Sequence, residues 1–448
     1  MKKAMKKIVS IGLCAAMLMG MTACGGKTEE KETRVIKIGT WYDMYYDSSH
    51  TNIHDNPNVS DEEIAQAQLD AVRAVEKKYG VKVEYVNLTY DGIKESINTS
   101  ILAGTPDCDI YQVELTFGIP AALKGYAMNL EDIVGSDSDI LTDQKVFKPI
   151  ELGAKKGIYL FRNNSLDLTL DNTYMLAFNK QMLDDVGLEN PNELYKKGEW
   201  TWEKWREYLL KLTRDTDGDG IVDIYGYSGP FETLIDNLLM SNGTGLAMTE
   251  KENLSSPEAA EVLNYIYNMY NVDKVASPWN YNDYESNRTM HVDAKVGCWI
   301  DCPWMSHSND NASFEFETIW CPWPIGPSGN QETNVTKRGS EGKGWMIPTS
   351  VKDPELVYNV LYDLQNWFNG DTDFRDGDTT WWEDGCVTEA NFEVLKEVAS
   401  KEGFDLWRSL SIDWDYNWIQ LLNGELTAAQ FQESFKYVLQ DALDSYYK

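Results

Sequence analysis

Histidine is scarce in this sequence, and the familiar catalytic motifs are missing from it. Only four histidines occur in 448 residues, and none stands at a metal-binding spacing. There is no G-x-S-x-G turn, no H-E-x-x-H helix and no phosphate-binding G-x-x-x-x-G-K-[ST] loop. These absences argue against a serine hydrolase, a zinc protease and an ATPase. They leave a glycosidase open, because it needs only two carboxylates and the chain has 72 acidic residues.

Positive charge is also scarce. Lys and Arg number 40 against 72 Asp and Glu, which gives a formal net charge of -32. Such a chain repels phosphate backbones, so we expect no nucleic-acid partner and no charge-driven binding to an anionic membrane. The hydrophobic content of 42% and the aromatic content of 12% predict a folded core rather than disorder. The length is sufficient for two domains.

Long hydrophobic runs are missing except near the N-terminus. Residues 1–7 are basic, residues 8–21 are almost wholly apolar, and a small residue precedes Cys24. This pattern is typical of a secretory signal peptide, and the apolar run is shorter than the about 20 residues that span a bilayer. The segment before Cys24 resembles the lipobox of bacterial lipoproteins. We therefore expect a signal peptide over 1–23, lipidation at Cys24 and a tether over 24–34. The alternative is an ordinary signal peptide with a chance cysteine.

A lipid anchor would hold the protein on the outer face of the cell membrane, which suggests a Gram-positive bacterium. Five cysteines remain after the signal peptide and Cys24 are set aside. An odd number outside the cell leaves at least one thiol unpaired if all bonds are intramolecular. We expect buried thiols, although a disulfide between Cys302 and Cys321 stays open. The five are Cys108, Cys298, Cys302, Cys321 and Cys386.

Hydrophobic periodicity predicts alternating strands and helices along the chain. The N-terminal part reads strand, helix, strand, helix, strand, which is typical of a parallel sheet with helices on its faces. The expected strands are 35–41, 81–88, 109–113, 173–178, 295–300 and 314–320, and the expected helices are 61–79, 91–102, 179–186, 199–212, 255–270, 354–368 and 430–447.

Several stretches, in order and at the right intervals, resemble motifs of one protein family. Each motif is weak by itself, but together they cover nearly the whole mature chain. The resemblance is to the family 1 extracellular solute-binding proteins, the carbohydrate-binding lipoproteins of ABC importers. The stretches are 41–43 (WYD), 102–107 (LAGTPD), 173–188 (TYMLAFNKQMLDDVGL), 200–213 (WTWEKWREYLLKLT), 295–304 (KVGCWIDCPW) and 344–348 (GWMIP).

The resemblance implies an α/β, two-lobed periplasmic-binding-protein-like fold of type II. Each lobe would be a mostly parallel sheet flanked by helices, and a multi-strand hinge would join the lobes. We expect lobe 1 over 35–145 and 335–368, and lobe 2 over 146–334 and 369–448. The implied partners are an oligosaccharide held in the interlobe cleft and the permease subunits of an ABC importer, with the protein itself a monomer.

The sharpest local signal is an acidic loop at 215–223, DTDGDGIVD. Its acids at loop positions 1, 3, 5 and 9, with Gly220 at position 6, match the start of a calcium loop. Position 12 is Gly226 instead of the usual Glu, so this is not a complete EF-hand. The alternative is an acidic surface turn without an ion. The predicted ligands of a structural Ca²⁺ are Asp215, Asp217, Asp219, the carbonyl of Ile221, and Asp223 directly or through water.

Sugar-binding residues are predicted from position. Loops at the carboxyl ends of strands line the binding side of open α/β sheets, and sugars are held by acids, amides and stacked aromatic rings. Trp304 also matches the stacking aromatic of the family. Trp202 and Trp205 share a helix stripe and are expected in the core instead. The candidate ligand-binding residues are Trp41, Tyr42, Asp43, Glu114, Trp304, Trp345, Trp381, Trp382 and Trp414.

The sequence thus predicts a lipid-anchored receptor that binds an oligosaccharide and does no covalent chemistry. Three alternatives stay open. One is a surface glycoside hydrolase or lyase, and another is a peptide or polyamine receptor on the same fold, which the acidic balance would suit. The third is a structural surface lipoprotein without a ligand.

Overall fold

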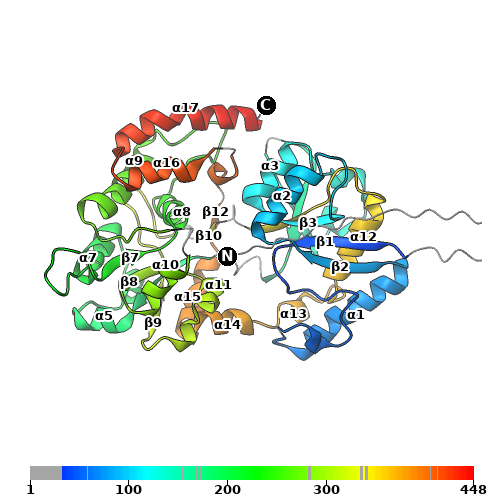
Figure 1. The fold of residues 1–448 in the computed structure, drawn as a ribbon, viewed down its shortest axis with the longest axis horizontal. Coiled ribbons are helices and arrows are strands. Elements are labelled where there is room, and N and C mark those ends of the chain that lie inside the picture. The colour runs from blue at the N-terminus through cyan, green and yellow to red at the C-terminus, as the bar shows by residue number, and fades with distance from the viewer. Residues whose placement is uncertain are drawn as a thin grey trace, which may run out of the picture.

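The computed structural model describes residues 33–57, 59–153, 155–166, 170, 173–280, 284–332, 337–338, 342–403, 405–410 and 412–447. The predicted signal peptide, Cys24 and the tether up to residue 32 lie outside these residues, so their assignment stays a prediction. The described chain forms two lobes, each built on one sheet with helices packed against it (Figure 1).

Lobe 1 is built on a six-stranded sheet of order β2-β1-β3-β11-β5-β4. Strand β1 runs parallel to β2 and β3, whereas the pairs β3–β11, β11–β5 and β5–β4 are antiparallel. The expectation of a mostly parallel sheet is therefore wrong, because β11 returns from lobe 2 instead of following a crossover helix. The strands are β1 (Val35–Thr40), β2 (Lys82–Asn87), β3 (Ile110–Glu114), β4 (Phe147–Ile150), β5 (Leu160–Asn163) and β11 (Lys343–Met346).

The helices of lobe 1 form where the periodicity predicts them. Asp61 accepts hydrogen bonds from the first free N–H groups of α1, and Gly80 ends that helix with φ 64. The buried stripe of α1 packs on Ile36 and Ile38 of β1, while α2 and α3 contribute to the larger core shared with lobe 2. The helices are α1 (Glu62–Tyr79), α2 (Tyr90–Ser100), α3 (Leu115–Leu123) and α12 (Pro354–Gln365).

Lobe 2 is built on a four-stranded sheet of order β7-β8-β6-β9, in which β7–β8 is parallel and β6 is antiparallel to both of its neighbours. This sheet too is mixed. On α7 the stripe that contains Trp202 and Trp205 is buried, as predicted. The strands are β6 (Met175–Asn179), β7 (Tyr225–Ser228), β8 (Val296–Asp301) and β9 (Thr318–Cys321).

Helices cover both faces of the lobe 2 sheet. Three further elements, β10 (Lys337–Arg338), β12 (Glu402–Gly403) and α13 (Thr372–Arg375), are short. Strands β10 and β12 form a two-stranded parallel sheet, and α13 follows α12. The lobe 2 helices are α5 (Lys180–Asp185), α6 (Pro191–Lys196), α7 (Trp202–Leu212), α8 (Phe231–Ser241), α9 (Pro257–Tyr267), α10 (Tyr284–Val292), α11 (Pro303–Asn309), α14 (Thr380–Cys386), α15 (Glu389–Ala399), α16 (Trp414–Leu422) and α17 (Ala428–Tyr447).

One predicted lobe boundary is wrong. Lobe 2 was expected to begin at residue 146, but β4 and β5 pair with each other inside the lobe 1 sheet. Pro149 lies within β4 and pairs with Phe161 of β5. Here β4 is the edge strand, where a residue without an N–H is tolerated. The first crossing therefore lies between Asn163 and Met175.

The two segments that leave lobe 1 are tied together at their start. Asn163 ends β5 and Gln365 ends α12, and Asn163 Nδ2 donates to Gln365 Oε1 at 2.7 Å. Further along, Asp376 Oδ1 accepts from the Leu166 N–H at 3.1 Å. Arg375 donates to the carbonyl of Lys145 at 2.7 Å. These contacts fix how the two crossings sit against each other.

Two further features bear on the sequence predictions. All five described cysteines are buried, and no disulfide joins any of them. Burial raises the pKa of Cys108 to about 12, so this thiol stays protonated and unreactive at neutral pH. Within the described residues, no helix has the length and apolar content needed to cross a bilayer.

Candidate functional site

An aromatic cluster stands at the carboxyl ends of the first strands of lobe 1. Trp41 directly follows β1 and meets three rings edge-on, with centroids at 5.4 Å for Tyr42, 6.0 Å for Tyr90 and 6.1 Å for Phe117. Tyr90 begins α2 just after β2, and Phe117 lies in the first turn of α3 just after β3. Three parallel strands thus deliver these rings to one edge of the sheet.

Two carboxylates lie in the same region. Glu114 ends β3, and its two oxygens accept from Tyr90 Oη at 3.1 Å and from Thr116 Oγ1 at 2.5 Å. Burial and the neighbouring Glu114 raise the pKa of Tyr90, so its hydroxyl stays a donor. Asp43 is exposed and accepts from Asn87 Nδ2 at 3.0 Å. Glu114 keeps oxygen lone pairs for a ligand hydroxyl, because each of its oxygens accepts only one of these bonds.

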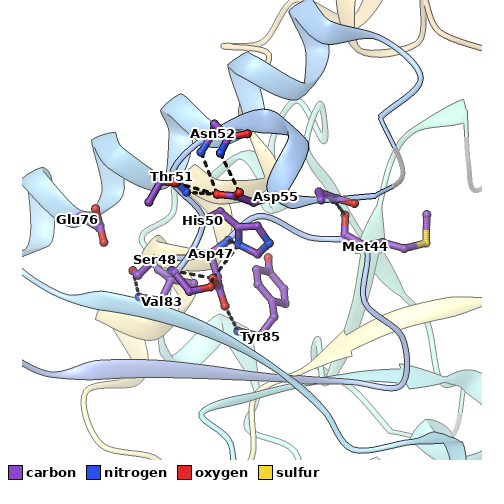
Figure 2. Close-up of polar contacts among 12 residues, drawn as sticks. Met44, Asp47, Ser48, His50, Thr51, Asn52, Asp55, Glu76, Val83 and Tyr85 are labelled. Carbon is purple, nitrogen blue, oxygen red and sulfur yellow. Dashed lines mark hydrogen bonds and ion pairs between the residues drawn. The ribbon is translucent and has the colours of Figure 1, made fainter.

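The loop after Asp43 returns the chain to the sheet and is held by two aspartates (Figure 2). Asp47 accepts from the N–H groups of Ser49 at 2.9 Å and Tyr85 at 3.3 Å. Asp55 closes a capping box with Asn52. The loop that carries the candidate residues therefore has a fixed base.

Tyr42 is braced by a stack of phenol rings and carries a cation on one face. Its hydroxyl lies 3.4 Å from that of Tyr45, which stacks on Tyr85 at 4.6 Å. Lys343 Nζ lies 5.0 Å from the Tyr42 ring centroid. Lys343 is also the register partner of Glu114 on the neighbouring strand. The result is a half-buried surface of mixed charge.

Trp345 was predicted to line the ligand site, and the structure corrects this. It is only 2% exposed, packs in the core of lobe 1, and donates from Nε1 to Asn163 Oδ1 at 2.8 Å. Trp414 is likewise 5% exposed, and its Nε1 donates to the carbonyl of Trp407 at 2.8 Å. Both indoles have an internal partner for their one N–H, so each serves as a core residue.

Lobe 2 carries its own exposed aromatic surface on helices α11 and α14. Trp304 is 37% exposed, and His307 lies one turn later on the same helix. The ring of His307 lies 4.8 Å from that of Trp381 at an interplanar angle of 31°. Trp381 is half-buried, and Trp382 meets it edge-on at 5.8 Å while packing against the core of lobe 2. The two helices pack closely, since a Cβ on Gly385 would lie 2.9 Å from Pro303.

The lobes also meet through a short 3-10 helix, η8 (Trp407–Ser409), which packs against α3. Ser409 Oγ donates to the carbonyl of Leu115 at 3.3 Å. Arg408 lies 3.6 Å from Asp236 of α8, and its charge opposes the rise in the pKa of Tyr90 across the lobe boundary. Arg408 therefore pairs with an acid of lobe 2 and also acts electrostatically on Tyr90 of lobe 1.

The acidic loop is folded around its own carboxylates. One ligand oxygen each of Asp215, Asp217 and Asp223 lie within 4.8 Å of one another. Asp215 also accepts from the N–H groups of Gly218 and Gly220 at 2.7 and 2.8 Å. These bonds lower the pKa of Asp215, and Thr216 lowers that of Asp223.

Of the four predicted carboxylate ligands, Asp219 lies outside that group. Asp219 instead accepts from the Ile221 N–H at 2.7 Å, and Ile221 is 66% exposed. The missing acid at position 12 has a steric reason. A Cβ on Gly226 would lie 2.4 Å from the Leu209 carbonyl.

The structure thus brings Trp41, Tyr42 and Glu114 together with Asp43 nearby, and separately gathers Trp304, Trp381 and Trp382. Sequence reasoning missed five neighbours. Two of them follow strand ends, so the rule that selected Glu114 would also have found them. The other three depend on register or on distant segments, which no local pattern shows. The five are Tyr90, Phe117, Lys343, His307 and Arg408.

Comparisons with known proteins agree with this architecture. A profile of the bacterial extracellular solute-binding proteins matches residues 56–373. Among curated protein sequences, none matches the chain. A maltose/maltodextrin-binding domain from Bdellovibrio bacteriovorus, solved with maltotriose, is 15% identical with a TM-score of 0.57, over 91% of this chain and 98% of that one.

Two other solved structures are similar. A Listeria monocytogenes ABC substrate-binding protein in complex with cycloalternan is 14% identical with a TM-score of 0.58, over 92% and 100% of the two chains. A Mycobacterium tuberculosis protein in complex with glycerophosphocholine is 14% identical with a TM-score of 0.60, over 85% and 95%. These likenesses confirm the two-lobed α/β fold.

Proposed function

Because the chain belongs to the bacterial extracellular solute-binding protein family, we propose that it binds an oligosaccharide between its lobes and delivers it to the permease subunits of an ABC importer. One observation carries the proposal. Each lobe presents accessible aromatic rings, Trp41 and Tyr42 on one side and Trp304 and Trp381 on the other. Ring faces bind the C–H faces of sugars, and Glu114 supplies hydroxyl acceptors beside them. Similar folds solved with maltotriose and cycloalternan support a sugar ligand.

The protein acts as a monomer held at the outer face of the membrane by a lipid on Cys24. The sequence pattern at 1–24 supports this anchor. Replacing Cys24 with Ala should release the protein into the medium, whereas an ordinary signal peptide would give a soluble product with or without Cys24. The lipid carries membrane attachment because the chain is too acidic to bind anionic lipids by charge.

The ligand test is a thermal-shift screen of residues 25–448 with starch, plant and host oligosaccharides. A ligand that binds only the native state raises the melting temperature. A rise with one sugar class, with the sugar recovered intact, supports the proposal. Degradation of a glycan would indicate a glycoside hydrolase or lyase instead. A response only to spermidine, a peptide or glycerophosphocholine would replace the sugar as ligand, and no response at all would favour a structural lipoprotein.

We also propose a structural Ca²⁺ in the acidic loop. Oxygens that share one Ca²⁺ at its usual bond length lie up to about 5 Å apart, and the three carboxylates of Asp215, Asp217 and Asp223 meet that condition. The loop also offers Asp219 and the Ile221 carbonyl, while water would stand in for the acid that Gly226 cannot supply. Calcium should raise the melting temperature of the unchanged protein but not of the double variant Asp215→Asn, Asp217→Asn. Equal curves with calcium and with EDTA would contradict the site.

A further inference from the structure

His307 has an exposed ring, and one hydrogen bond determines which of its two ring nitrogens carries the hydrogen. Its Nε2 lies 2.8 Å from the carbonyl oxygen of Trp381. A carbonyl can only accept, so Nε2 must carry the hydrogen. In the neutral imidazole Nδ1 is then an acceptor with its lone pair outward, and no described residue makes a hydrogen bond to it. The backbone of α14 thus selects one tautomer of a residue on α11.

The His307 ring also continues an aromatic surface. Trp304 precedes it by one turn on α11, and the ring of Trp381 lies 4.8 Å away on α14. Both helices lie on the side of lobe 2 that faces lobe 1 (Figure 1). Asp378, just before α14, accepts a hydrogen bond from Ser60 of lobe 1, which places the start of α14 at the lobe boundary. Trp304, His307 and Trp381 are therefore called the lobe 2 platform.

We propose that His307 is a ligand-binding residue whose Nδ1 accepts a hydrogen bond from a hydroxyl of a sugar stacked on the lobe 2 platform. The inference rests on the proposed function and narrows it to neutral glycans with a free hydroxyl at that position. A methyl ether there has no hydrogen to donate. A uronate carboxylate at that position also has no hydrogen to donate to Nδ1. Its negative charge would in addition be repelled by the net negative charge of the protein.

Three variants separate the roles of this side chain. His307→Phe keeps a ring beside Trp381 but removes the acceptor, so the Kd should rise about threefold to tenfold. His307→Ala also removes the ring and should raise the Kd by about tenfold or more. His307→Gln can still donate to the Trp381 carbonyl and accept from the sugar, so its Kd should stay within about twofold of the original. His54→Ala is the matched control, since His54 is also exposed but lies in lobe 1.

The measurement is isothermal titration of residues 25–448 with maltotriose, cellotriose, xylotriose and mannotriose, and with permethylated and uronate forms of the best binder. Melting temperatures of all variants confirm that each is folded. The proposal is supported if His307→Phe loses affinity, His307→Gln retains it and both modified glycans bind weakly. Wild-type affinity in His307→Phe and His307→Ala would overturn the inference while the receptor function stands. If the unchanged protein binds none of the sugars, both fall.

Discussion

The two lobes present their aromatic rings in different ways. In lobe 1, Trp41 meets three other rings and Tyr42 is backed by Tyr45, so the candidate surface continues the packed interior. In lobe 2, Trp304 and Trp381 stand on two short helices, and Trp304 is 37% exposed. We infer that changes to the lobe 1 surface affect stability and binding together. Changes to the lobe 2 platform should affect binding alone.

Each lobe also contains a buried aspartate, and the two differ in the direction of their pKa shift. Asp301 of lobe 2 accepts from Cys302 N, Trp299 Nε1 and Asn311 Nδ2, yet complete burial outweighs these bonds and raises its pKa to about 7. Asp47 of lobe 1 is also buried, but hydrogen bonds from the 49–50 turn and from Tyr85 outweigh burial and lower its pKa. These two aspartates should therefore contribute to the pH dependence of stability with opposite sign.

The largest expected effect is on the buried side of lobe 1. Replacing Trp345 with Ala removes a 2% exposed indole and leaves Asn163 Oδ1 without its donor. Large aromatic-to-Ala changes in a core cost about 3 to 5 kcal/mol of unfolding free energy. Urea denaturation measures this loss. Trp304→Ala is the control, and it should change the unfolding free energy by less than about 1 kcal/mol. Equal losses of unfolding free energy in Trp345→Ala and Trp304→Ala would show that the core and the lobe 2 platform do not differ in their contribution to stability.

Much of this architecture could be predicted from local pattern, and the exceptions share a cause. The stripe of α7 and the capped ends of α1 need only neighbours in sequence, so periodicity located both. The edge position of β4 depends on the order of the whole sheet. The antiparallel return of β11 depends on pairing with strands far away in the sequence, such as Trp345 with Phe161.

The candidate site shows the same division between features set by local sequence and features set by distant parts of the chain. Position after a strand selected Trp41 and Glu114, and both contact Tyr90, while their role in binding stays a prediction. Composition could not tell an exposed tryptophan from a buried one. Trp345 lies within β11 and is 2% exposed, whereas Trp304 lies in the first turn of α11 and is 37% exposed. Burial is a tertiary property, which explains why Trp345 and Trp414 were assigned wrongly.

The next effect tests the two aspartates through pH. Asp301 holds its proton in the folded state where the unfolded chain has lost it, so unfolding free energy should fall by roughly 2 to 4 kcal/mol as pH rises from about 4 to 7. Asp301→Asn should remove that slope. Asp47 acts in the opposite direction, and its stabilisation is lost as pH falls below about 4. Chemical denaturation from pH 3 to 8 measures both. An equal slope between pH 4 and 7 in Asp301→Asn and in the unchanged protein would contradict the assignment.

A smaller effect tests the platform itself. Replacing Trp304 with Ala should weaken binding of the best oligosaccharide by more than about threefold, because an aromatic contact is worth about 1 kcal/mol. Titration calorimetry measures the change, and Trp414→Ala serves as a control that removes a buried indole. An affinity within threefold of the original protein would show that Trp304 does not stack on the sugar.

The smallest effect tests the contact between the lobes. Ser409→Ala removes the 3.3 Å hydrogen bond to the Leu115 carbonyl, and so long a bond contributes only about 0.5 kcal/mol. Ser308→Ala is a matched control, because Ser308 Oγ bonds the Trp304 carbonyl within lobe 2 at 2.9 Å. The Ser409 bond joins the two lobes, whereas the Ser308 bond lies within lobe 2. Only Ser409→Ala should therefore destabilise the arrangement in which η8 packs against α3. Small-angle scattering of the ligand-free protein should therefore show a larger radius of gyration for Ser409→Ala than for Ser308→Ala. Identical radii would mean that η8 and α3 stay packed without this bond. The contact between the lobes would then be as firmly packed as the aromatic surface of lobe 1.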